Sequence, residues 1–284
     1  MSFQEKGQPA AEPAPCRLGT SRLLFRGPVG PLTGRYVAFL GGTESYGRFV
    51  DRPYPDRLQT LTGVRSANFA CLNAGVDAFL NTEEVIQASR GATLRVVQVL
   101  GAQNMTNRYY SVHPRRNDRF LRASPSLKSL FGEVDFTTFN FTRHMLATLR
   151  DVSPERFAIL AETLKLSWIS RMRQLLSSVG GPVVLLRMAD HAPPPPGAEP
   201  RLDRDPLLVD AEMIAAVVPF ATVHVNVRIP LASEDPPDAR GLSPYQAAAA
   251  AEMPGPRAHV AVAEALAPVL RDLLQPAVRP GRPS

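Results

Sequence analysis

The stretch that decides the fold is Tyr36-Val-Ala-Phe-Leu40, followed at once by Gly41-Gly42. Five consecutive apolar residues without alternation are typical of a strand that is buried on both faces, and the glycine pair predicts a tight turn at its end. A second, mostly apolar stretch, Leu94-Arg-Val-Val-Gln-Val-Leu100, also reads as a strand and is ended by Gly101. Strands buried on both faces are typical of parallel sheets that are covered by helices.

Strand-like and helix-like stretches alternate along the rest of the chain. We expect three more strands, at residues 68–73, 182–188 and 221–227. Helical patterns separate the strands, at residues 46–50, 55–61, 82–91, 153–179, 207–218 and 257–274. Such alternation favours a parallel sheet between two helical layers. The sequence therefore predicts an α/β fold, a three-layer sandwich with a mainly parallel five-stranded sheet and flavodoxin-like topology.

Residues 102–152 break this alternation, because they are polar and rich in arginine and aromatic residues. We expect an insertion at about 105–152 that contains one or two short helices and lies over the strand ends. The rest of 21–275 forms a single domain in this interpretation. Residues 1–20 carry several prolines and no long apolar run, so they predict a disordered tail, as do residues 276–284.

The composition excludes several classes of protein. The chain has 284 residues, of which 44% are hydrophobic, and this is enough for a sizeable core. Two cysteines exclude a disulfide scaffold, and no apolar run approaches the ~18 residues of a membrane span. The N-terminus lacks the apolar region of a secretory signal, so we expect a cytoplasmic protein. The net charge of +6 is compatible with the binding of an acidic ligand.

Ligands of open parallel sheets bind beyond the carboxyl ends of the strands. This rule selects residues 41–45, 73–77, 101–104 and the loop before the last helix as the candidate site. In the first segment, Thr43 or Ser45 is a candidate nucleophile, because a strand-to-helix turn exposes its side chains to a cleft. The alternative is structural, since either hydroxyl can cap the following helix.

Four short motifs occur in order at these positions: GGTES at 41–45, NAGVD at 73–77, GAQNM at 101–105 and PRAH at 256–259. Together they resemble the SGNH, or GDSL-type, hydrolases. The resemblance implies that Thr43, or alternatively Ser45, is the nucleophile and that His259 is the base. It also implies that Gly75 and Asn104 are the oxyanion donors. The sequence further resembles a bacterial family with no assigned activity that shares GGTES, NAGVDAFLN and HPRRNDRF.

The sequence departs from the SGNH pattern at four positions. Thr43 stands where the family has its nucleophilic serine, and the family's aspartates are replaced by Gly42, Met105 and Pro256. A threonine hydroxyl can attack a carbonyl when a base takes its proton, although its methyl group crowds the approach. His259 lacks an orienting carboxylate, so a backbone carbonyl would have to fix its tautomer. A protein that binds a ligand without catalysis is equally consistent with these departures.

A second unusual stretch, Asn107–Arg122, contains five arginines, one histidine and three aromatic residues. One interpretation is an anion-binding lid over the cleft, for a sulfate, phosphate or carboxylate group. The residues that bind the anion in this interpretation are His113, Arg115, Arg116 and Arg119. The other interpretation is a solvated basic helix that pairs with acidic neighbours. A nucleic-acid partner is not expected, because the arginines are concentrated beside a cleft of the size that small molecules occupy.

We therefore expect an esterase or acyl-transfer-like hydrolase with a Thr43/His259 site. Its substrate would be a small molecule, anionic or linked to carbohydrate. The alternative is a non-catalytic protein that binds a small anionic ligand on the same fold. No P-loop or Gly-x-Gly-x-x-Gly pattern is present and the histidines lack ligand spacing, so we expect no cofactor and no metal. The sequence does not specify the oligomeric state.

Overall fold

The computed structural model of the protein describes residues 14–27, 29–238 and 241–275. Its centre is a five-stranded sheet in the order β4-β3-β5-β8-β9, in which every neighbouring pair is parallel. The strands are β3 (Tyr36–Leu40), β4 (Arg65–Asn68), β5 (Leu94–Gln98), β8 (Val183–Ala189) and β9 (Val223–Arg228). This strand order is that of flavodoxin-like, doubly wound sheets, so the predicted fold class is confirmed.

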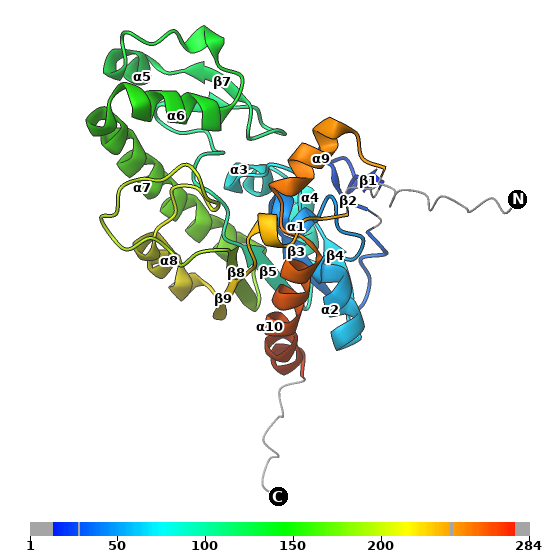
Figure 1. The fold of residues 1–284 in the computed structure, drawn as a ribbon. Coiled ribbons are helices and arrows are strands. Elements are labelled where there is room, and N and C mark those ends of the chain that lie inside the picture. Colours follow the sequence, from blue (N-terminus) through cyan, green and yellow to red (C-terminus); the bar gives the residue numbers. More distant parts are fainter. Residues whose placement is uncertain (1–13, 28, 239–240, 276–284) are drawn as a thin grey trace, which may run out of the picture.

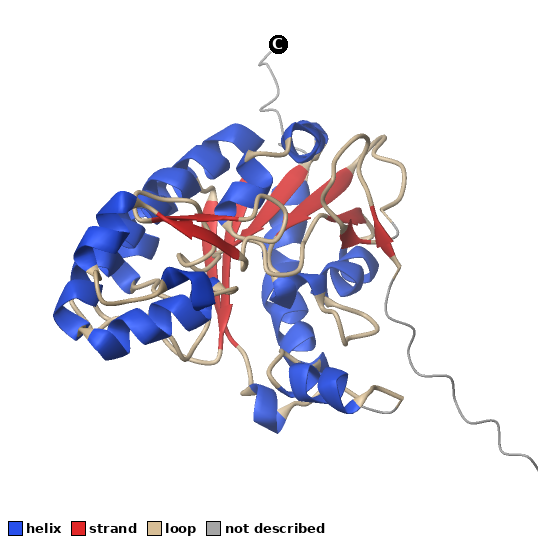
Figure 2. Ribbon diagram, turned by 90° about the horizontal axis from the view of Figure 1, so that it is seen from above, coloured by secondary structure: helices blue, strands red, loops and turns tan. Residues whose placement is uncertain are grey.

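Helices cover both faces of the sheet (Figures 1 and 2). One face carries α2 (Tyr54–Thr62) and α10 (Pro256–Leu274), which also pack against each other. The other face carries α3 (Val76–Leu80), α4 (Glu83–Gly91), α7 (Pro154–Val179) and α8 (Ala211–Val217). The sheet is therefore the middle layer of three.

The burial of strand β3 on both faces of the sheet explains its uninterrupted apolar run. Each of its residues is at most 2% exposed. Phe39 packs in the cluster of α2 and α10, whereas Leu40 packs in the cluster of α7. The α7 cluster also contains Trp168, which is fully buried and is the only tryptophan of the chain. Its indole N–H donates a hydrogen bond to the Leu100 carbonyl at 2.7 Å, just beyond the end of β5.

The insertion lies beyond the carboxyl ends of the strands and is seen at the top of Figure 1. It contains the antiparallel pair β6 (Tyr110–Val112) and β7 (Phe120–Ala123), then α5 (Pro125–Leu130), a 3₁₀ turn at Phe136–Thr138 and α6 (Thr142–Val152). The sequence predicts short helices here but not the antiparallel pair. The two strands are three and four residues long, which is too short for a period of two to be recognised.

Two elements near the carboxyl edge differ from their predicted bounds. Helix α1 (Thr43–Tyr46) begins directly after Gly42, and Gly47 ends it with a left-handed φ of 61°. Strand β4 ends at Asn68, where the sequence predicts that a strand begins. The apolar residues 69–71 follow β4 as a loop along the end of β3, because the Phe69 N–H still bonds the Phe39 carbonyl.

The described chain is already ordered before residue 21. The two-residue strand β1 (Pro15–Cys16) pairs with β2 (Phe25–Arg26), and Phe25 packs edge-on against Phe69 with ring centroids 5.9 Å apart. Residues 14–20, which fall within the predicted N-terminal tail, are therefore part of the described structure. Residues 1–13 and 276–284 of the predicted tails lie outside the described residues. The remaining elements are 3₁₀ turns at Val218–Phe220 and Ala232–Glu234 and the helix α9 (Pro244–Ala251).

Candidate active site

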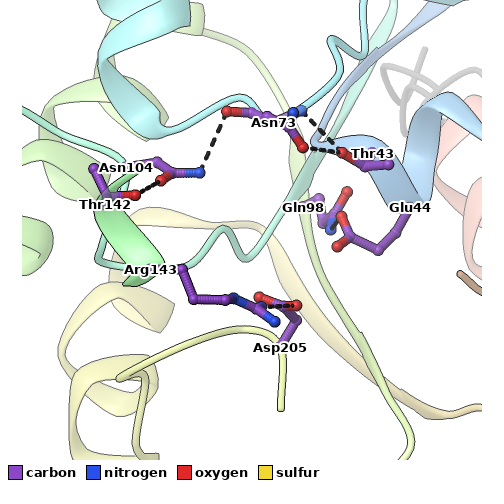
Figure 3. Close-up of polar contacts among 8 residues, drawn as sticks. All are labelled: Thr43, Glu44, Asn73, Gln98, Asn104, Thr142, Arg143 and Asp205. Atoms are coloured by element: carbon purple, nitrogen blue, oxygen red, sulfur yellow. Dashed lines mark hydrogen bonds and ion pairs between the residues drawn. The ribbon is translucent and has the colours of Figure 1, made fainter. Parts of the chain in front are cut away.

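A cavity of about 950 Å³ lies at the carboxyl ends of β3, β4, β5 and β8. The segments that follow these strands form one side of it, and α6 with the loop 202–206 forms the facing side (Figure 3). The lining includes residues 42–44, 73–74, 98–101, 103–104, 118, 141–144, 188–190, 202–206, 229–233 and 251–254. The cavity therefore lies at the carboxyl edge of the sheet, where the strand-end rule places the candidate site.

Thr43 and Asn73 form the first pair of this site (Figure 3). The Thr43 hydroxyl accepts a hydrogen bond from the Asn73 N–H at 2.8 Å and donates one to the Asn73 Oδ1 at 3.2 Å. Asn73 has a left-handed φ of 56°, which asparagine tolerates better than most residues. The two bonds fix the loop after β4 to the start of α1. They also direct the Thr43 proton to an amide oxygen, which is not a base.

Side-chain amides connect this loop to the insertion. The Asn73 Nδ2 donates to Asp118 at 3.2 Å, and the Asn104 Nδ2 donates to the Asn73 carbonyl at 3.3 Å. The hydroxyl of Thr142, at the start of α6, donates to the Asn104 Oδ1 at 2.8 Å. Asn104 therefore lies in the cavity wall with its donor toward the loop after β4, and the insertion is joined to the strand ends by its polar side chains.

Gly75 lies where two strand-end loops touch. A Cβ on Gly75 would be 1.6 Å from the Asn104 carbonyl oxygen, so only glycine permits this approach. The Gly75 N–H donates to the Asn117 Oδ1 at 2.9 Å, and Gly75 is not part of the cavity lining. Its predicted role as an oxyanion donor therefore needs correction. The buried Asn117 side chain, which the insertion supplies, already occupies that donor.

Glu44 and Gln98 form a second polar pair of the cavity, and neither residue is among the catalytic or binding residues predicted from the sequence (Figure 3). Glu44 borders the cavity, and the Gln98 Nε2 donates to its Oε2 at 2.8 Å. Burial raises the pKa of the Glu44 carboxyl, and the nearby Asp205 carboxylate adds to the rise. The hydrogen bond from Gln98 and the charge of Arg143 act in the opposite direction. A carboxyl in such a setting is suited to give and take protons.

Arg143 and Asp205 face Glu44 across the cavity. Arg143 belongs to α6, and its Nη2 lies 2.5 Å from a carboxylate oxygen of Asp205, which belongs to the loop after β8. Their side chains are 49% and 44% exposed. An exposed pair of this kind contributes less than about 1 kcal/mol to stability. It nevertheless connects the insertion to a separate segment of the chain and sets the charge opposite Glu44.

Ser45, the alternative nucleophile, does not reach the cavity. It is fully buried, and its hydroxyl bonds the side chains of Gln98 and Tyr54. It also makes no capping bond at α1, whose N-cap is Gly42. Both predicted roles of Ser45 therefore need correction. The reason is that α1 starts at Thr43, which turns position 45 toward the core.

His259 is the main departure from the predicted site. Its ring is fully buried, stacks on the Tyr54 ring at 6.0 Å, and is not part of the cavity lining. The Nδ1 accepts a hydrogen bond from the Tyr54 N–H at 3.1 Å, and the Nε2 has no partner in the described chain. Burial, with Arg26 and Arg57 nearby, lowers the pKa of His259 to about 3. The structure thus does not pair His259 with Thr43.

The basic stretch contributes through residues other than those predicted. His113, Arg115, Arg116 and Arg119 are not among the residues that line the cavity. The His113 Nδ1 accepts hydrogen bonds from the N–H groups of Arg115 and Arg116, both at 3.2 Å, which closes a local turn. The Arg119 guanidinium lies 4.4 Å from the centre of the Phe141 ring. The predicted anion-binding lid is therefore not formed by these four side chains.

The chain belongs to a family whose model matches residues 1–274 and which is described as a domain of unknown function, DUF6473. The comparison with curated proteins gives no match. The family establishes what this chain is related to, and its description assigns no activity.

Two of the solved structures that are similar to this chain are a lipase and an acetylxylan esterase. One is the lipase Lip_vut3 from a goat rumen metagenome, with 12% identity, 85% of this chain and 98% of that chain covered, and a TM-score of 0.41. The other is a catalytic mutant of Axe2, an acetylxylan esterase from Geobacillus stearothermophilus, with 14% identity, coverage of 88% and 98%, and a TM-score of 0.41. At these TM-scores the fold assignment rests on the strand order of the sheet itself.

Two further observations concern the described residues only. No helix among them is long and apolar enough to cross a bilayer. No group of three or more histidine, cysteine, aspartate or glutamate side chains in residues 14–27, 29–238 and 241–275 is arranged to hold a metal ion.

Proposed function

We propose that this member of the DUF6473 family is a hydrolase that cleaves an ester of a small molecule in the cavity, with Glu44 as the acid–base group. The observation that carries the proposal is the setting of the Glu44 carboxyl. It borders the cavity at the carboxyl edge of the sheet, Gln98 holds one of its oxygens, and its pKa is raised. A carboxyl whose pKa is raised is better matched to proton transfer near neutral pH.

In the proposed reaction, the Glu44 carboxylate takes a proton from water while the water oxygen attacks the acyl carbon. The carbonyl electron pair moves to the carbonyl oxygen and then returns, which breaks the bond to the alcohol oxygen. Glu44 gives its proton to the leaving alcohol and is again a carboxylate. One ester and one water give one acid and one alcohol. General acid–base catalysis of this kind contributes typically ~10²–10⁴-fold to the rate.

Asn104 is the best-placed donor for the negative charge that develops on the carbonyl oxygen. Its Nδ2 bonds the Asn73 carbonyl at 3.3 Å, a long bond that a charged oxygen can replace. Arg143 brings positive charge to the facing side of the same cavity. The two groups come from separate elements, so the reacting carbonyl would lie between them.

The Glu44 route is better supported than a covalent route through Thr43. A hydroxyl nucleophile needs a base within hydrogen-bond reach. The Thr43 proton points to the Asn73 amide oxygen, and His259 lies outside the cavity. Thr43 is then a residue that holds the Asn73 loop in place.

The charge of the lining favours an uncharged substrate over the anionic one expected from the sequence. The carboxylates of the lining are Glu44, Asp118, Asp190, Asp203, Asp205 and Glu252. Its guanidinium groups are Arg143 and Arg204. Carboxylates and side-chain amides bind hydroxyl groups well, because they accept the hydroxyl proton. We propose that the alcohol part of the ester carries free hydroxyl groups, as a carbohydrate does.

A panel of nitrophenyl and acylated-sugar esters tests the proposal. We expect the purified chain to hydrolyse a subset of them, and Glu44→Gln to lose that activity. A fluorophosphonate probe with an intact-mass readout distinguishes the two routes, because it labels an activated hydroxyl and not a carboxylate. An adduct on Thr43 would replace the Glu44 route with the covalent one. Hydrolysis that is unchanged in Glu44→Gln would reject the proposed role of Glu44.

One observation favours the alternative, a binding protein without catalysis. The Thr43 hydroxyl makes both of its hydrogen bonds to Asn73, as a purely structural hydroxyl does. In that case the cavity would bind a hydroxylated ligand and turn none of it over. Titration calorimetry with the same panel, together with product analysis, separates the two functions, because the alternative predicts binding heat and no product.

A further inference from the structure

A chain of hydrogen bonds runs from Glu44 into the core, away from the cavity. Gln98 is its first member, and its Oε1 accepts from the Gly42 N–H at 3.0 Å and from the Ser45 hydroxyl at 2.5 Å. A backbone N–H can only donate. The amide oxygen of Gln98 must therefore face Gly42, and its amide nitrogen must face Glu44.

Ser45 and Tyr54 continue the chain in the same sense. The single hydroxyl proton of Ser45 is used toward the Gln98 oxygen, which has no proton to give. The Tyr54 hydroxyl, 2.7 Å from the Ser45 Oγ, must therefore be the donor in their contact. Ser45 and Tyr54 are both fully buried, so water does not compete with these bonds. Every donor in the chain points toward Glu44.

We infer that Tyr54, Ser45 and Gln98 are positioning residues that hold the Glu44 carboxyl toward the cavity and favour its charged form. Hydrogen bonds that follow one another in one direction polarise each other, and the effect is larger in a buried setting. The last donor of the chain, the Gln98 Nε2, engages only Oε2 and leaves Oε1 for water or substrate. The inference rests on the proposed function, because it concerns how Glu44 is prepared for proton transfer.

Other charges also act on Glu44 and have to be separated from the chain. Asp205, on the loop after β8, opposes its ionisation, and Arg143 on α6 favours it. The other titratable side chains that line the cavity are Asp118, His144, Asp190, Asp203, Arg204 and Glu252. None of these belongs to the buried chain. A change confined to Ser45 or Tyr54 therefore tests the chain with those charges in place.

The experiment is a carbon-13 NMR titration of the Glu44 side-chain carboxyl in the full-length chain, with the signal assigned from its absence in Glu44→Gln. We expect the pKa of Glu44 to rise in Ser45→Ala and in Tyr54→Phe, and to rise most in Gln98→Leu. Each substitution removes a donor that favours the carboxylate. The acidic limb of any hydrolysis profile should move to higher pH by the same amount.

Tyr36→Phe is the matched control. Tyr36 is also buried, and its hydroxyl donates to the Ala88 carbonyl on the other helical layer, outside the chain. Its loss should leave the pKa of Glu44 unchanged. A pKa that stays at the parent value in folded Ser45→Ala and Tyr54→Phe would overturn the inference. The titration needs no substrate, so its outcome is independent of whether the proposed hydrolysis is found.

Discussion

Glu44 and His259 are both ionisable, and burial disfavours the charged form of each. Glu44 belongs to helix α1, and His259 lies beside Gly47 at the end of that helix. The pKa of Glu44 is raised and that of His259 is lowered, so each is shifted toward its neutral form. The difference between them is access. Glu44 borders the cavity, whereas His259, near the start of α10, is fully buried and stacks on the Tyr54 ring. A perturbed pKa therefore makes a group a candidate for function only where a substrate can reach the group.

Glu44→Gln is the sharpest test of this comparison. It keeps the size of the side chain and an oxygen that can accept the hydrogen bond from Gln98, and it removes the ability to take a proton. We expect a loss of hydrolysis of at least ~100-fold. The melting temperature should stay near that of the parent, because the residue is only partly buried. Rates on the most active ester, with thermal unfolding beside them, measure both.

Glu264→Gln serves as the control for that experiment, since Glu264 is exposed on α10 and is not part of the cavity lining. It should match the parent in both measurements. Equal losses in the two variants would mean that the charge change, and not the position, causes the effect.

His259→Ala should show the opposite profile, with a large loss of stability. It leaves a void beside Tyr54 and removes the acceptor of the Tyr54 N–H. We expect the free energy of unfolding to fall by about 3 kcal/mol. Activity per folded molecule should change little. Chemical denaturation and assays well below the melting temperature separate the two, and a selective loss of turnover would restore His259 as a catalytic residue.

The pH dependence of stability gives an independent test of His259. Its pKa is about 3 in the folded chain and its ordinary value is 6.5. Between these values the unfolded chain binds a proton that the folded chain does not, so stability falls as the pH is lowered from 6.5 toward 3. The slope for one such proton is about 1.4 kcal/mol per pH unit. The contribution is fully present above pH 6.5.

Carboxyl groups also titrate in this range, so the difference between the parent and His259→Gln is the quantity to measure. Denaturation curves at several pH values should show a gap that shrinks as the pH falls from 6.5. A constant gap would mean that His259 is not held neutral in the folded chain.

Thr43 should produce an intermediate effect. Thr43→Ala removes both bonds to Asn73 and lets the loop after β4 move, so we expect about a tenfold loss of hydrolysis, equivalent to about 1.4 kcal/mol. Thr43→Ser keeps both bonds and should retain the activity. Steady-state rates for the two variants decide the role of the hydroxyl. Complete loss in Thr43→Ala with an intact fold would point back to a nucleophile.

Arg116→Ala should have the smallest effect. Its side chain is exposed and lies outside the cavity lining. We expect a change in stability within about 0.5 kcal/mol and no change in hydrolysis. Asn117→Ala is the informative neighbour, because it removes the acceptor of the Gly75 N–H and should lower stability more. A strong effect of Arg116→Ala on substrate binding would support the hypothesis that this stretch is an anion-binding lid.

The fold could be predicted because the pattern of apolar residues along a segment indicates which side of a strand or helix is buried. The uninterrupted run of β3 and the helical period of α7 are local patterns, and both elements form where they are expected. The bounds of β4 could not be read in this way, because the apolar residues after Asn68 pack as a loop and look like a strand in sequence. The antiparallel pair β6–β7 is too short to give a periodic signal.

The site was less predictable, because its members are far apart in sequence. Asp205 faces Glu44 across the cavity, although Glu44 belongs to α1 and Asp205 to the loop after β8. Glu44 itself lies in the first turn of α1, where an acidic residue is usual for reasons of helix stability alone. The sequence pattern therefore favours the neighbouring hydroxyls of Thr43 and Ser45, and not Glu44, as catalytic groups. A polar Gln98 in the middle sheet strand was the one local signal that pointed to Glu44.

The position of Trp168 makes the protein its own optical reporter. A single indole gives one emission spectrum, with no second tryptophan to be subtracted from it. Its shielding from solvent should place that emission at short wavelength and make it inaccessible to added iodide. Because its N–H is bonded to the carbonyl that leads into Gly101–Asn104, the same signal is coupled to the backbone beside the cavity. Fluorescence can thus follow global unfolding and rearrangement at this strand end without any label.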